Sequence, residues 1–502
     1  MNQNEMSYLG LDIGTGGCKA LVFDRSGQEL AYAFSEYSLI HPEPGLAELD
    51  PEEVITKCFE VIAEVNSRTV DPVTAMGISS QGEAFAPVGK DGSILGNAMV
   101  SSDSRAKEIS SRCSARFGNK ELYRITGHTP HPLFTLFKIL WIKENRPDLW
   151  KKASLFLCFE DLFHYKVRLE PRISWPLAGR TMLFDVTSHR WSHEILSAAG
   201  LPEHKLATPV PAGEIVGVMD KAFSSKLGFT APVTVVTGGH DQTCAALGAG
   251  VTEAGHCMYA TGSVECFCPA LDGPRFSEEL RKHNLCCYDY TIRGKYTTVA
   301  YSLTGGNILR WWRDGFYRPV NGEGWSDGQQ AYSELLDEMP EDPSDLLVLP
   351  YLSATGTPYF DVDASGAILG LRMTTGRGEV TRSLLEGVAM EMKLNLKLME
   401  GSGMHITTLI ATGGGTRNRK WTQLKADVLN KKIIVRSTTE SGCLGAAMLA
   451  RSAMEKVPVE SLSGHSVSGT EIFTPDPGKV DVYNRKFGQY EKLYHILKEI
   501  SP

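Results

Sequence analysis

The chain has 502 residues, of which 42% are hydrophobic and 22% charged, and its formal net charge is −8. That length exceeds what a single hydrophobic core usually serves, so two large domains are expected. A negative charge without a long lysine or arginine cluster argues against a nucleic-acid partner. No stretch is apolar enough to span a membrane and no secretory signal opens the chain, so a cytoplasmic protein is expected.

The chain contains eleven cysteines, an odd number, scattered among the predicted strands and helices. This usage is typical of reduced, buried thiols rather than of a disulfide framework. Five of the cysteines lie between positions 257 and 287. Their spacing lacks the paired C-x-x-C pattern of a zinc site, so no zinc is expected there.

The first motif is a glycine-rich hairpin. Residues 8–24 read YLGLDIGTGGCKALVFD, which predicts an apolar strand, a tight turn and a second strand. The turn can present backbone N–H groups and the Thr15 hydroxyl to a phosphate, with Lys19 as a nearby charge and Asp12 available for Mg²⁺ through water. Glycine in a hairpin turn can equally serve geometry alone, so both interpretations are open at this point.

Two polar segments follow. Gln81 and Glu83 come directly after a predicted strand at 75–79, and Asp103 and Arg105 lie in a second polar loop. Polar groups beyond a strand's carboxyl end often bind ligands in α/β sheets, and paired donors and acceptors suit a polyhydroxylated ligand. Solvated loops are the alternative interpretation. The segment 175–185 shows little readable chemistry, and the histidines of this half share no metal-ligand spacing.

The central stretch, residues 232–250, reads PVTVVTGGHDQTCAALGAG. A β-branched run meets a Gly238-Gly239 turn, and His240-Asp241 then begin a helix of small residues. A carboxylate at such a junction can accept a proton from a substrate hydroxyl if it faces a cleft. The alternative is that Asp241 only caps the helix, since Asp is a preferred N-cap residue.

The second half of the chain repeats the pattern of its beginning. Residues 255–268 again predict strand, glycine turn and strand, and 296–301 predict a further strand. Two similar domains that face each other, each with a phosphate-binding hairpin, are therefore expected. Later glycines at 305–306 and 413–415 precede predicted helices, an arrangement that suits close approach by a nucleotide.

Taken together, these residues resemble the FGGY carbohydrate kinases, closest in pattern to xylulokinase-like and gluconokinase-like members. The resemblance is carried by LDIGTGGCKA, FKILWIKEN, GGHDQTCAALGAG, GAILGLRMTTGRGEVTRSLLEGVA and LIATGGGTRNRKWTQLKADVLNKKI with ESGCLGAAMLA, in the expected order. It implies an α/β fold of two ribonuclease H-like (actin/hexokinase-type) domains with a cleft between them. Residues 1–245 would bind the sugar and 246–502 the nucleotide.

Carried over position by position, the resemblance implies an ATP-dependent sugar kinase in which Asp241 is the general base and Asp12 and Asp241 place Mg²⁺. The nucleotide would be held by Thr15, Gly16 and Lys19 on the first domain and by Thr261, Gly262, Gly305, Gly414, Gly415 and Asn418 on the second. The small-molecule sugar or polyol would contact Gln81, Glu83, Asp103, Arg105, Asp241 and Gln242.

The sugar site departs from the family pattern. Gln81-Gly82-Glu83 matches neither the Gln-Met-His of xylulokinases nor the Gln-Arg-Glu of glycerol kinases, and Ser101 stands where both usually have Trp. A ketopentose-like acceptor is expected, with glycerol, a tetritol or gluconate as alternatives in the same class. A non-catalytic sugar-sensing regulator and an actin-fold ATPase acting on protein partners are alternatives of other classes. A homodimer would be ordinary for the family.

Overall fold

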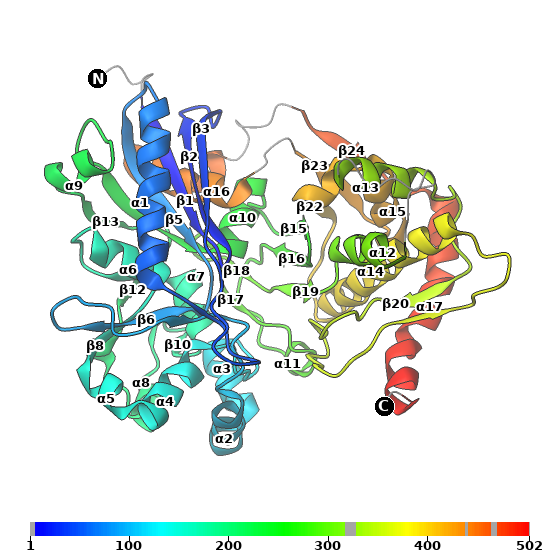
Figure 1. Cartoon of the computed structure of the whole chain (residues 1–502), viewed down its shortest axis with the longest axis horizontal. Helices are drawn as coiled ribbons and strands as arrows, with labels where there is room; N and C mark the ends of the chain where they lie inside the picture. Colours follow the sequence, from blue (N-terminus) through cyan, green and yellow to red (C-terminus); the bar gives the residue numbers. More distant parts are fainter. Residues whose placement is uncertain (1–5, 317–327, 437–439, 463–468, 501–502) are drawn as a thin grey trace.

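The computed structural model describes residues 6–316, 328–436, 440–462 and 469–500. Its centre is a pair of six-stranded sheets in two lobes (Figure 1). In each sheet, three consecutive strands form an antiparallel meander. The first strand of the meander pairs on its other side with a parallel strand. A second parallel strand and an antiparallel edge strand then complete the sheet. The duplication expected from the sequence is therefore confirmed.

The first sheet has the strand order β13-β14-β5-β1-β2-β3. Along its strands, apolar residues either alternate with polar ones or form continuous runs, because helices cover both faces of the sheet. Helix α1 (Pro51–Arg68) packs against β2 and β3. Asp50 caps α1 by accepting from the Glu52 N–H. The strands are β1 (Ser7–Ile13), β2 (Gly17–Asp24), β3 (Glu29–Glu36), β5 (Val73–Ser80), β13 (Ile215–Val218) and β14 (Thr234–His240).

The second sheet has the order β19-β16-β15-β22-β23-β24. The prediction of a single strand at 296–301 is wrong, because this segment contributes to two strands, β18 (Tyr296–Thr297) and β19. Strand β18 pairs with β17 (Tyr288–Asp289) outside this sheet. The strands of the sheet are β15 (His256–Thr261), β16 (Glu265–Pro269), β19 (Ala300–Ser302), β22 (Thr408–Thr412), β23 (Lys432–Val435) and β24 (Glu471–Phe473).

One helix of the second half packs on the sheet of the first half. Helix α16 (Ser441–Glu455) follows β23, yet it lies against β1 and β5 and crosses α10 (Asp241–Ala249) (Figure 1). Glycine permits this contact, since a Cβ on Gly10 or Gly77 would lie 1.8 Å or 2.2 Å from a backbone carbonyl oxygen of α16. The two lobes are thus joined by helices whose N-terminal ends point into the space between the sheets.

The remaining elements surround this core. A four-stranded sheet and most small helices extend the first lobe, and long helices cover the second. The first group comprises β4 (Glu48–Leu49), β6 (Phe85–Gly89), β7 (Ala98–Met99), β8 (Ala153–Cys158), α2 (Lys107–Phe117), α3 (Asn119–Thr126), α4 (Thr135–Asn145), α5 (Pro147–Lys152), α6 (Phe159–Lys166), α7 (Trp175–Ala178), α8 (His193–Ala199) and α9 (Lys221–Lys226). The second comprises α11 (Glu278–Lys282), α12 (Asn307–Phe316), α13 (Gly328–Asp337), β20 (Leu347–Leu349), β21 (Ala367–Leu369), α14 (Arg377–Gly401), α15 (Arg419–Leu429) and α17 (Pro477–Ile500). Short strand pairs are formed by β9 (Arg172–Ser174) with β12 (Thr208–Val210) and by β10 (Phe184–Asp185) with β11 (Arg190–Trp191).

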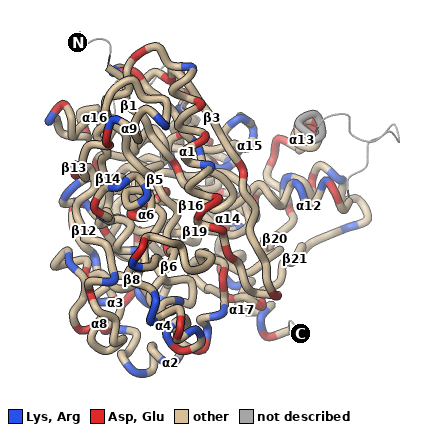
Figure 2. Tube along the Cα trace, turned by 60° about the vertical axis from the view of Figure 1, so that its left-hand side comes forward, with Lys and Arg blue, Asp and Glu red and all other residues tan. Residues whose placement is uncertain are grey.

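The cysteines are free thiols in the structure. All eleven are unpaired and ten of them are buried, as predicted. Basic and acidic residues are interspersed along the chain trace (Figure 2). Within the described ranges, no helix has the length and apolar character needed to cross a membrane. The predicted domain boundary between residues 245 and 246 falls inside α10 and stays a prediction.

Candidate active site

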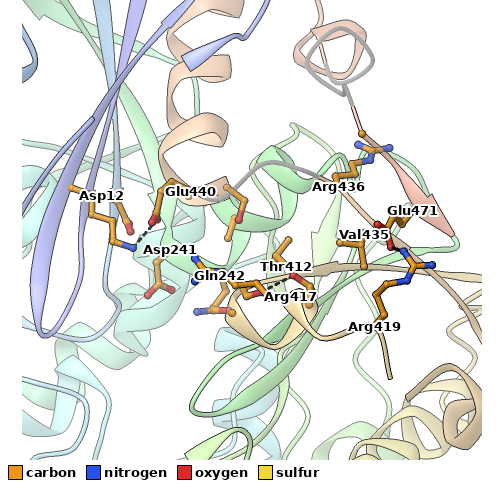
Figure 3. A pocket seen from close by; sticks show the side chains of 18 residues that line it. Asp12, Asp241, Gln242, Thr412, Arg417, Arg419, Val435, Arg436, Glu440 and Glu471 are labelled. Atoms are coloured by element: carbon orange, nitrogen blue, oxygen red, sulfur yellow. Dashed lines mark hydrogen bonds and ion pairs between the residues drawn. The ribbon is translucent and has the colours of Figure 1, made fainter. Parts of the chain in front are cut away.

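A cavity of about 680 Å³ lies between the two sheets and is lined from both lobes (Figure 3). Asp12, Asp241 and Glu440 lie at one end, and Arg419, Arg436 and Glu471 lie at the other. The cavity thus joins an acidic end, next to the first sheet, to a more basic end next to the second. Of the predicted site residues, those that line it are Asp12, Lys19, Asp241, Gln242 and Gly414.

Asp241 is presented to this cavity by a tightly packed strand-to-helix junction. The register between β14 and β5 shifts between Thr237 and Gly239, and a Cβ on Gly238 would lie 1.9 Å from the Ile78 carbonyl oxygen. Only glycine fits there. Asp241 is the first helical residue of α10, whereas His240 occupies the N-cap position. The alternative that Asp241 merely caps the helix is therefore wrong.

The two cleft carboxylates have perturbed protonation. Burial, and then the charges of Asp12 and Glu83, raise the pKa of Asp241 to about 7. Burial also raises the pKa of Asp12, whose Oδ1 accepts a 2.6 Å hydrogen bond from the Ser79 hydroxyl. The buried Oδ1 of Asp241 has no hydrogen-bond partner among the described residues. Two such carboxylates in one cleft suit a divalent cation.

The donor set fits Mg²⁺ better than a metal held by a full protein cage. Within the described ranges, no group of three or more His, Cys, Asp or Glu residues could hold a metal ion. Mg²⁺ commonly takes one or two carboxylates and completes its shell with water and phosphate oxygens. Asp12 and Asp241 are the residues that would hold it here.

A buried glutamate supports the junction that carries Asp241. Glu160 lies in the first turn of α6, where its Oε1 accepts from the Gly238 N–H at 2.8 Å. Its Oε2 accepts from the Ser174 N–H at 2.8 Å and from the Ser174 hydroxyl at 2.7 Å. Burial raises the pKa of Glu160 to about 7. Glu160 therefore positions Asp241 without lining the cavity, and no local sequence pattern reveals it.

The first glycine hairpin has its polar side chains engaged. Thr15 donates to the Gln81 amide oxygen at 3.2 Å, and the Gln81 amide donates to the Gly14 carbonyl at 2.8 Å. Lys19 Nζ lies 2.6 Å from Glu440, the residue before α16. Burial lowers the pKa of Lys19, but the pairing with Glu440 outweighs that effect, so the net shift of the pKa is upward. Lys19 thus links the hairpin of one lobe to the helix arriving from the other.

The second set of predicted nucleotide residues also comes together. Thr261 donates to the Thr412 carbonyl at 3.0 Å, and a Cβ on Gly415 would lie 2.8 Å from the Thr261 hydroxyl. A Cβ on Gly305 would lie 3.0 Å from the Gly262 carbonyl oxygen. These contacts leave no space for a side chain at 305 or 415, so glycine is needed where the turns pack against each other. Asn418 instead caps α15, where its side chain accepts from the Trp421 N–H at 2.9 Å.

Several cavity residues were missed by sequence reasoning. Arg436 is half-buried at the end of β23, where Nη1 donates to the Ala249 carbonyl at 2.9 Å and Nε has no hydrogen-bond partner within the described ranges. Gly442 sits against Asp12, since a Cβ there would lie 3.4 Å from the carboxylate. A basic residue after a strand is a weak local signal, which explains the omission. Others in this group are Arg417, Arg419, Glu440 and Ser441.

Of the six residues predicted to contact the acceptor, Asp241 and Gln242 line this cavity, whereas Gln81, Glu83, Asp103 and Arg105 do not. Asp103 and Arg105 pair with each other, and Arg105 Nη2 also lies 2.7 Å from Glu48. Trp141 stacks on the Arg105 guanidinium at 5.0 Å, and the buried Lys138 donates to the carbonyls at 99 and 100. The conspicuous Lys and Trp of α4 thus hold the second polar loop in place. Glu83 pairs with Arg180, and Gln81 contacts the first hairpin as described above.

A histidine fills the space that the family pattern assigns to a side chain at position 82. A Cβ on Gly82 would lie 3.0 Å from Cδ2 of His240 and 3.5 Å from Cβ of Arg180. His240 Nε2 lies 3.2 Å from Asp241 Oδ1, and its Nδ1 lies 2.9 Å from the Tyr288 hydroxyl. Burial, and then Arg180, lower the pKa of His240 well below its ordinary range, so the ring is neutral. Arg180 lies in the segment 175–185, in which the sequence predicted no functional residue.

The duplicated sheets with a cleft between them define the actin/hexokinase-type class of two-domain proteins. Within that class, the chain belongs to the FGGY family of carbohydrate kinases. The family model for the N-terminal domain matches residues 7–248, and the model for the C-terminal domain matches residues 274–454. Both the predicted fold and the predicted class of enzyme are thereby confirmed.

Individual relatives cover nearly the whole chain. The xylulose kinase of Bacillus subtilis (strain 168) is 26% identical over 99% of this chain and 98% of its own length. The gluconokinase of the same organism is 25% identical over 98% and 96%. The solved structure of a ligand-bound xylulose kinase from Lactobacillus acidophilus is similar with a TM-score of 0.90 at 22% identity, covering 98% of both chains. Plasmodium falciparum glycerol kinase with ADP gives 0.86 at 21% identity, covering 97% of this chain and 98% of that one.

Proposed function

We propose that this carbohydrate kinase transfers the γ-phosphate of ATP to a terminal hydroxyl of a ketopentose such as xylulose, with Asp241 as the general base. The observation that carries the proposal is the position of Asp241 at the start of α10, in the same cavity as Asp12 and the glycine turn of the second lobe. The relatives of this chain include xylulose kinases of similar length from several bacteria, which supports a ketopentose as the acceptor.

The chemistry follows from the arrangement of the cleft. The substrate hydroxyl oxygen attacks the γ-phosphorus, the bond to the bridging oxygen of ADP breaks, and the hydroxyl proton goes to Asp241. A pKa of about 7 leaves Asp241 a proton acceptor at neutral pH. Mg²⁺, when bound by Asp12 and Asp241, supplies charge neutralisation at the transferring phosphate. Lys19 adds a positive charge on the same side.

The other nucleotide contacts belong to the same proposal. The turns at Thr15-Gly16, Thr261-Gly262, Gly305 and Gly414-Gly415 would hold ATP through backbone N–H groups, as in other glycine-rich anion sites. Asn418 acts through its cap on α15. The crossed helices α10 and α16 connect both lobes, so closure of the cleft would align base and nucleotide. A cytoplasmic location, supported by the unpaired cysteines, and a homodimer stay predictions.

A panel of acceptors tests this proposal. We expect Mg²⁺-dependent ADP release from ATP with xylulose, and rates at least about tenfold lower with gluconate, glycerol and a tetritol. Asp241→Ala should lose turnover but still bind ATP. Asp185→Asn, in a turn that does not line the cleft, should keep its turnover. A preference for gluconate would favour the gluconokinase activity named for some relatives. No stimulation by any acceptor would favour a non-catalytic sensor instead.

A further inference from the structure

A buried ion pair lies in the second lobe, outside the wall of the cleft. Glu265 is the first residue of β16 and Lys425 lies in α15. Their side chains are 0% and 2% exposed, and Oε1 of the glutamate is 2.6 Å from Nζ of the lysine. Neither atom has another hydrogen-bond partner among the described residues. A buried charge that loses its partner is strongly destabilising, so each residue depends on the other.

The surroundings of the pair fix its position. Oε2 of Glu265 accepts a hydrogen bond from the hydroxyl of Tyr259, which is fully buried in β15. The Lys425 ammonium lies over the rings of Tyr259 and Trp421, at 5.0 Å and 3.9 Å from their centroids. Cation–π attraction adds to the charge–charge attraction at such distances. The pair is therefore held between β15, β16 and α15.

This ion pair completes a closed ring of contacts around the glycine turn that follows β22. Glu265 is opposite Thr261 in the β15–β16 ladder. A Cβ on Gly413 would lie 2.7 Å from the Thr261 carbonyl oxygen, and a Cβ on Gly415 would lie 2.8 Å from its hydroxyl. On its other side the turn leads into α15, which Lys425 anchors to Glu265. The turn is thus held from both directions through one ion pair.

The same turn forms the second lobe's wall of the cleft. Gly413, Gly414, Thr416 and Arg417 line the cavity, whereas Glu265 and Lys425 do not (Figure 3). A displacement of α15 or of the β15–β16 hairpin would therefore change the shape of the cleft where the nucleotide is proposed to bind.

The entrance of α12 depends on the same glutamate. The Gly306 N–H donates to the Gly262 carbonyl in the β15–β16 hairpin at 2.7 Å. A Cβ on Gly305 would lie 2.9 Å from Cγ of Glu265. Both glycine segments of the second lobe, at 305–306 and 413–415, therefore pack on the hairpin that Glu265 connects to α15.

We propose that Glu265 and Lys425 are positioning residues for the nucleotide, and that their ion pair holds the turn at 413–417 in the arrangement that binds ATP. Neither residue is ion-paired or hydrogen-bonded to Asp12 or Asp241, whose partners are Ser79 and His240. Loss of the pair should therefore affect the nucleotide and spare the acceptor. This inference rests on the proposed kinase activity, because it assumes that the cleft binds a nucleotide.

The test separates positioning from general stability. Lys425→Met removes the ammonium group and keeps a side chain of similar length. The matched control is Lys486→Met, which takes a lysine from another buried acid of the same lobe. Lys486 Nζ lies 2.5 Å from Glu386 in α14, the side chains are 11% and 1% exposed, and neither residue lines the cleft. A third protein combines Lys425→Met with Glu265→Gln, so that no unpaired charge stays buried.

Three quantities are measured for each protein. Calorimetry gives the affinity for ADP with Mg²⁺ in the absence of acceptor. Initial rates give KM for ATP and KM for xylulose, and thermal melts give the Tm.

We expect Lys425→Met to bind ADP about tenfold more weakly and to raise KM for ATP by a similar factor, because small displacements of positioning groups are costly. KM for xylulose should not change. Lys486→Met should lower the Tm but leave ADP affinity and both KM values as in the natural chain. The double variant should regain stability, because replacing both members of a buried ion pair is often neutral, yet it should keep the weak binding of ADP.

Natural ADP affinity in a folded Lys425→Met would overturn the inference. Recovery of ADP affinity together with stability in the double variant would overturn it as well, and so would an equal loss of affinity in Lys486→Met. The double variant carries the comparison if Lys425→Met does not fold. A natural chain that binds ADP but phosphorylates no acceptor would contradict the proposed kinase activity alone, so the two failures are distinguishable.

Discussion

Acidification should inactivate the enzyme through Asp241. A general base works only when ionised, so activity is present above its pKa and is lost as the pH falls through that value. Burial, and then the charges of Asp12 and Glu83, raise the pKa of Asp241 to about 7. At about pH 6 roughly a tenth of Asp241 is ionised, and at about pH 8 roughly nine tenths, so kcat/KM should rise about tenfold over this interval.

A substitution in the neighbouring carboxylate tests the cause of the shift. Asp12→Asn removes one of the charges that raise the pKa of Asp241. The inflection in kcat/KM should therefore move to lower pH, even though the maximal rate also falls because Asp12 is a proposed Mg²⁺ ligand. Asp185→Asn, which does not line the cleft and does not contribute to the shift of Asp241, should leave the inflection in place.

The assay is the initial rate of ADP release at subsaturating xylulose and constant ionic strength, across about pH 5.5 to 8.5. Intrinsic tryptophan fluorescence would verify that the protein stays folded over the same range. A flat profile, or an inflection near the ordinary Asp value of about 4, would refute the assignment of Asp241 as a base with a raised pKa. An inflection that does not move in Asp12→Asn would refute the electrostatic explanation.

Three further predictions concern the surroundings of Asp241. Because the folded pKa of Asp241 exceeds its unfolded value, ionisation destabilises the fold increasingly from about pH 4 to about pH 7. Asp241→Asn should therefore raise the Tm at pH 8 and leave it unchanged near pH 4, while kcat falls about 10²-fold or more; an unchanged Tm at pH 8 would contradict this. Gly82→Met should lower kcat/KM at least about tenfold because its Cβ would lie 3.0 Å from the His240 ring, and adding His240→Ala should recover part of the loss. Wild-type kinetics of Gly82→Met would show that His240 does not occupy that space. Glu160→Gln turns an amide N–H toward a backbone donor and should lower the free energy of unfolding by about 1–3 kcal/mol in urea titrations, with a lower kcat. The exposed Glu170→Gln is its control, and equal stability of the two variants would remove the positioning role of Glu160.

The parts of the site that are predictable from sequence depend on local patterns. Glycines between β-branched strands indicate the hairpin turns, and the strand, Gly238-Gly239 and Asp241 indicate the junction without reference to distant residues. The repeated strand–turn–strand pattern likewise predicts the second sheet, since each sheet begins with the same meander.

The rest depends on contacts between distant segments. Helix α16 is predictable as a helix, but its docking on β1 and β5 depends on glycines more than 350 residues earlier in the chain, at 10 and 77. Arg180 gains its meaning only through its ion pair with Glu83, which lies 97 residues earlier in the chain. The interval 296–301 is continuous in sequence but serves two sheets, a division that strand propensity does not reveal.

The central claim is phosphoryl transfer from ATP to a sugar hydroxyl at Asp241. Its most direct test is ³¹P NMR of a mixture of enzyme, ATP, Mg²⁺ and xylulose, compared with the same mixture containing Asp241→Asn. The account predicts a phosphomonoester resonance that grows in step with ADP in the natural protein and is absent with the variant. Release of ADP with inorganic phosphate in place of the monoester, or equal monoester formation by Asp241→Asn, would contradict it.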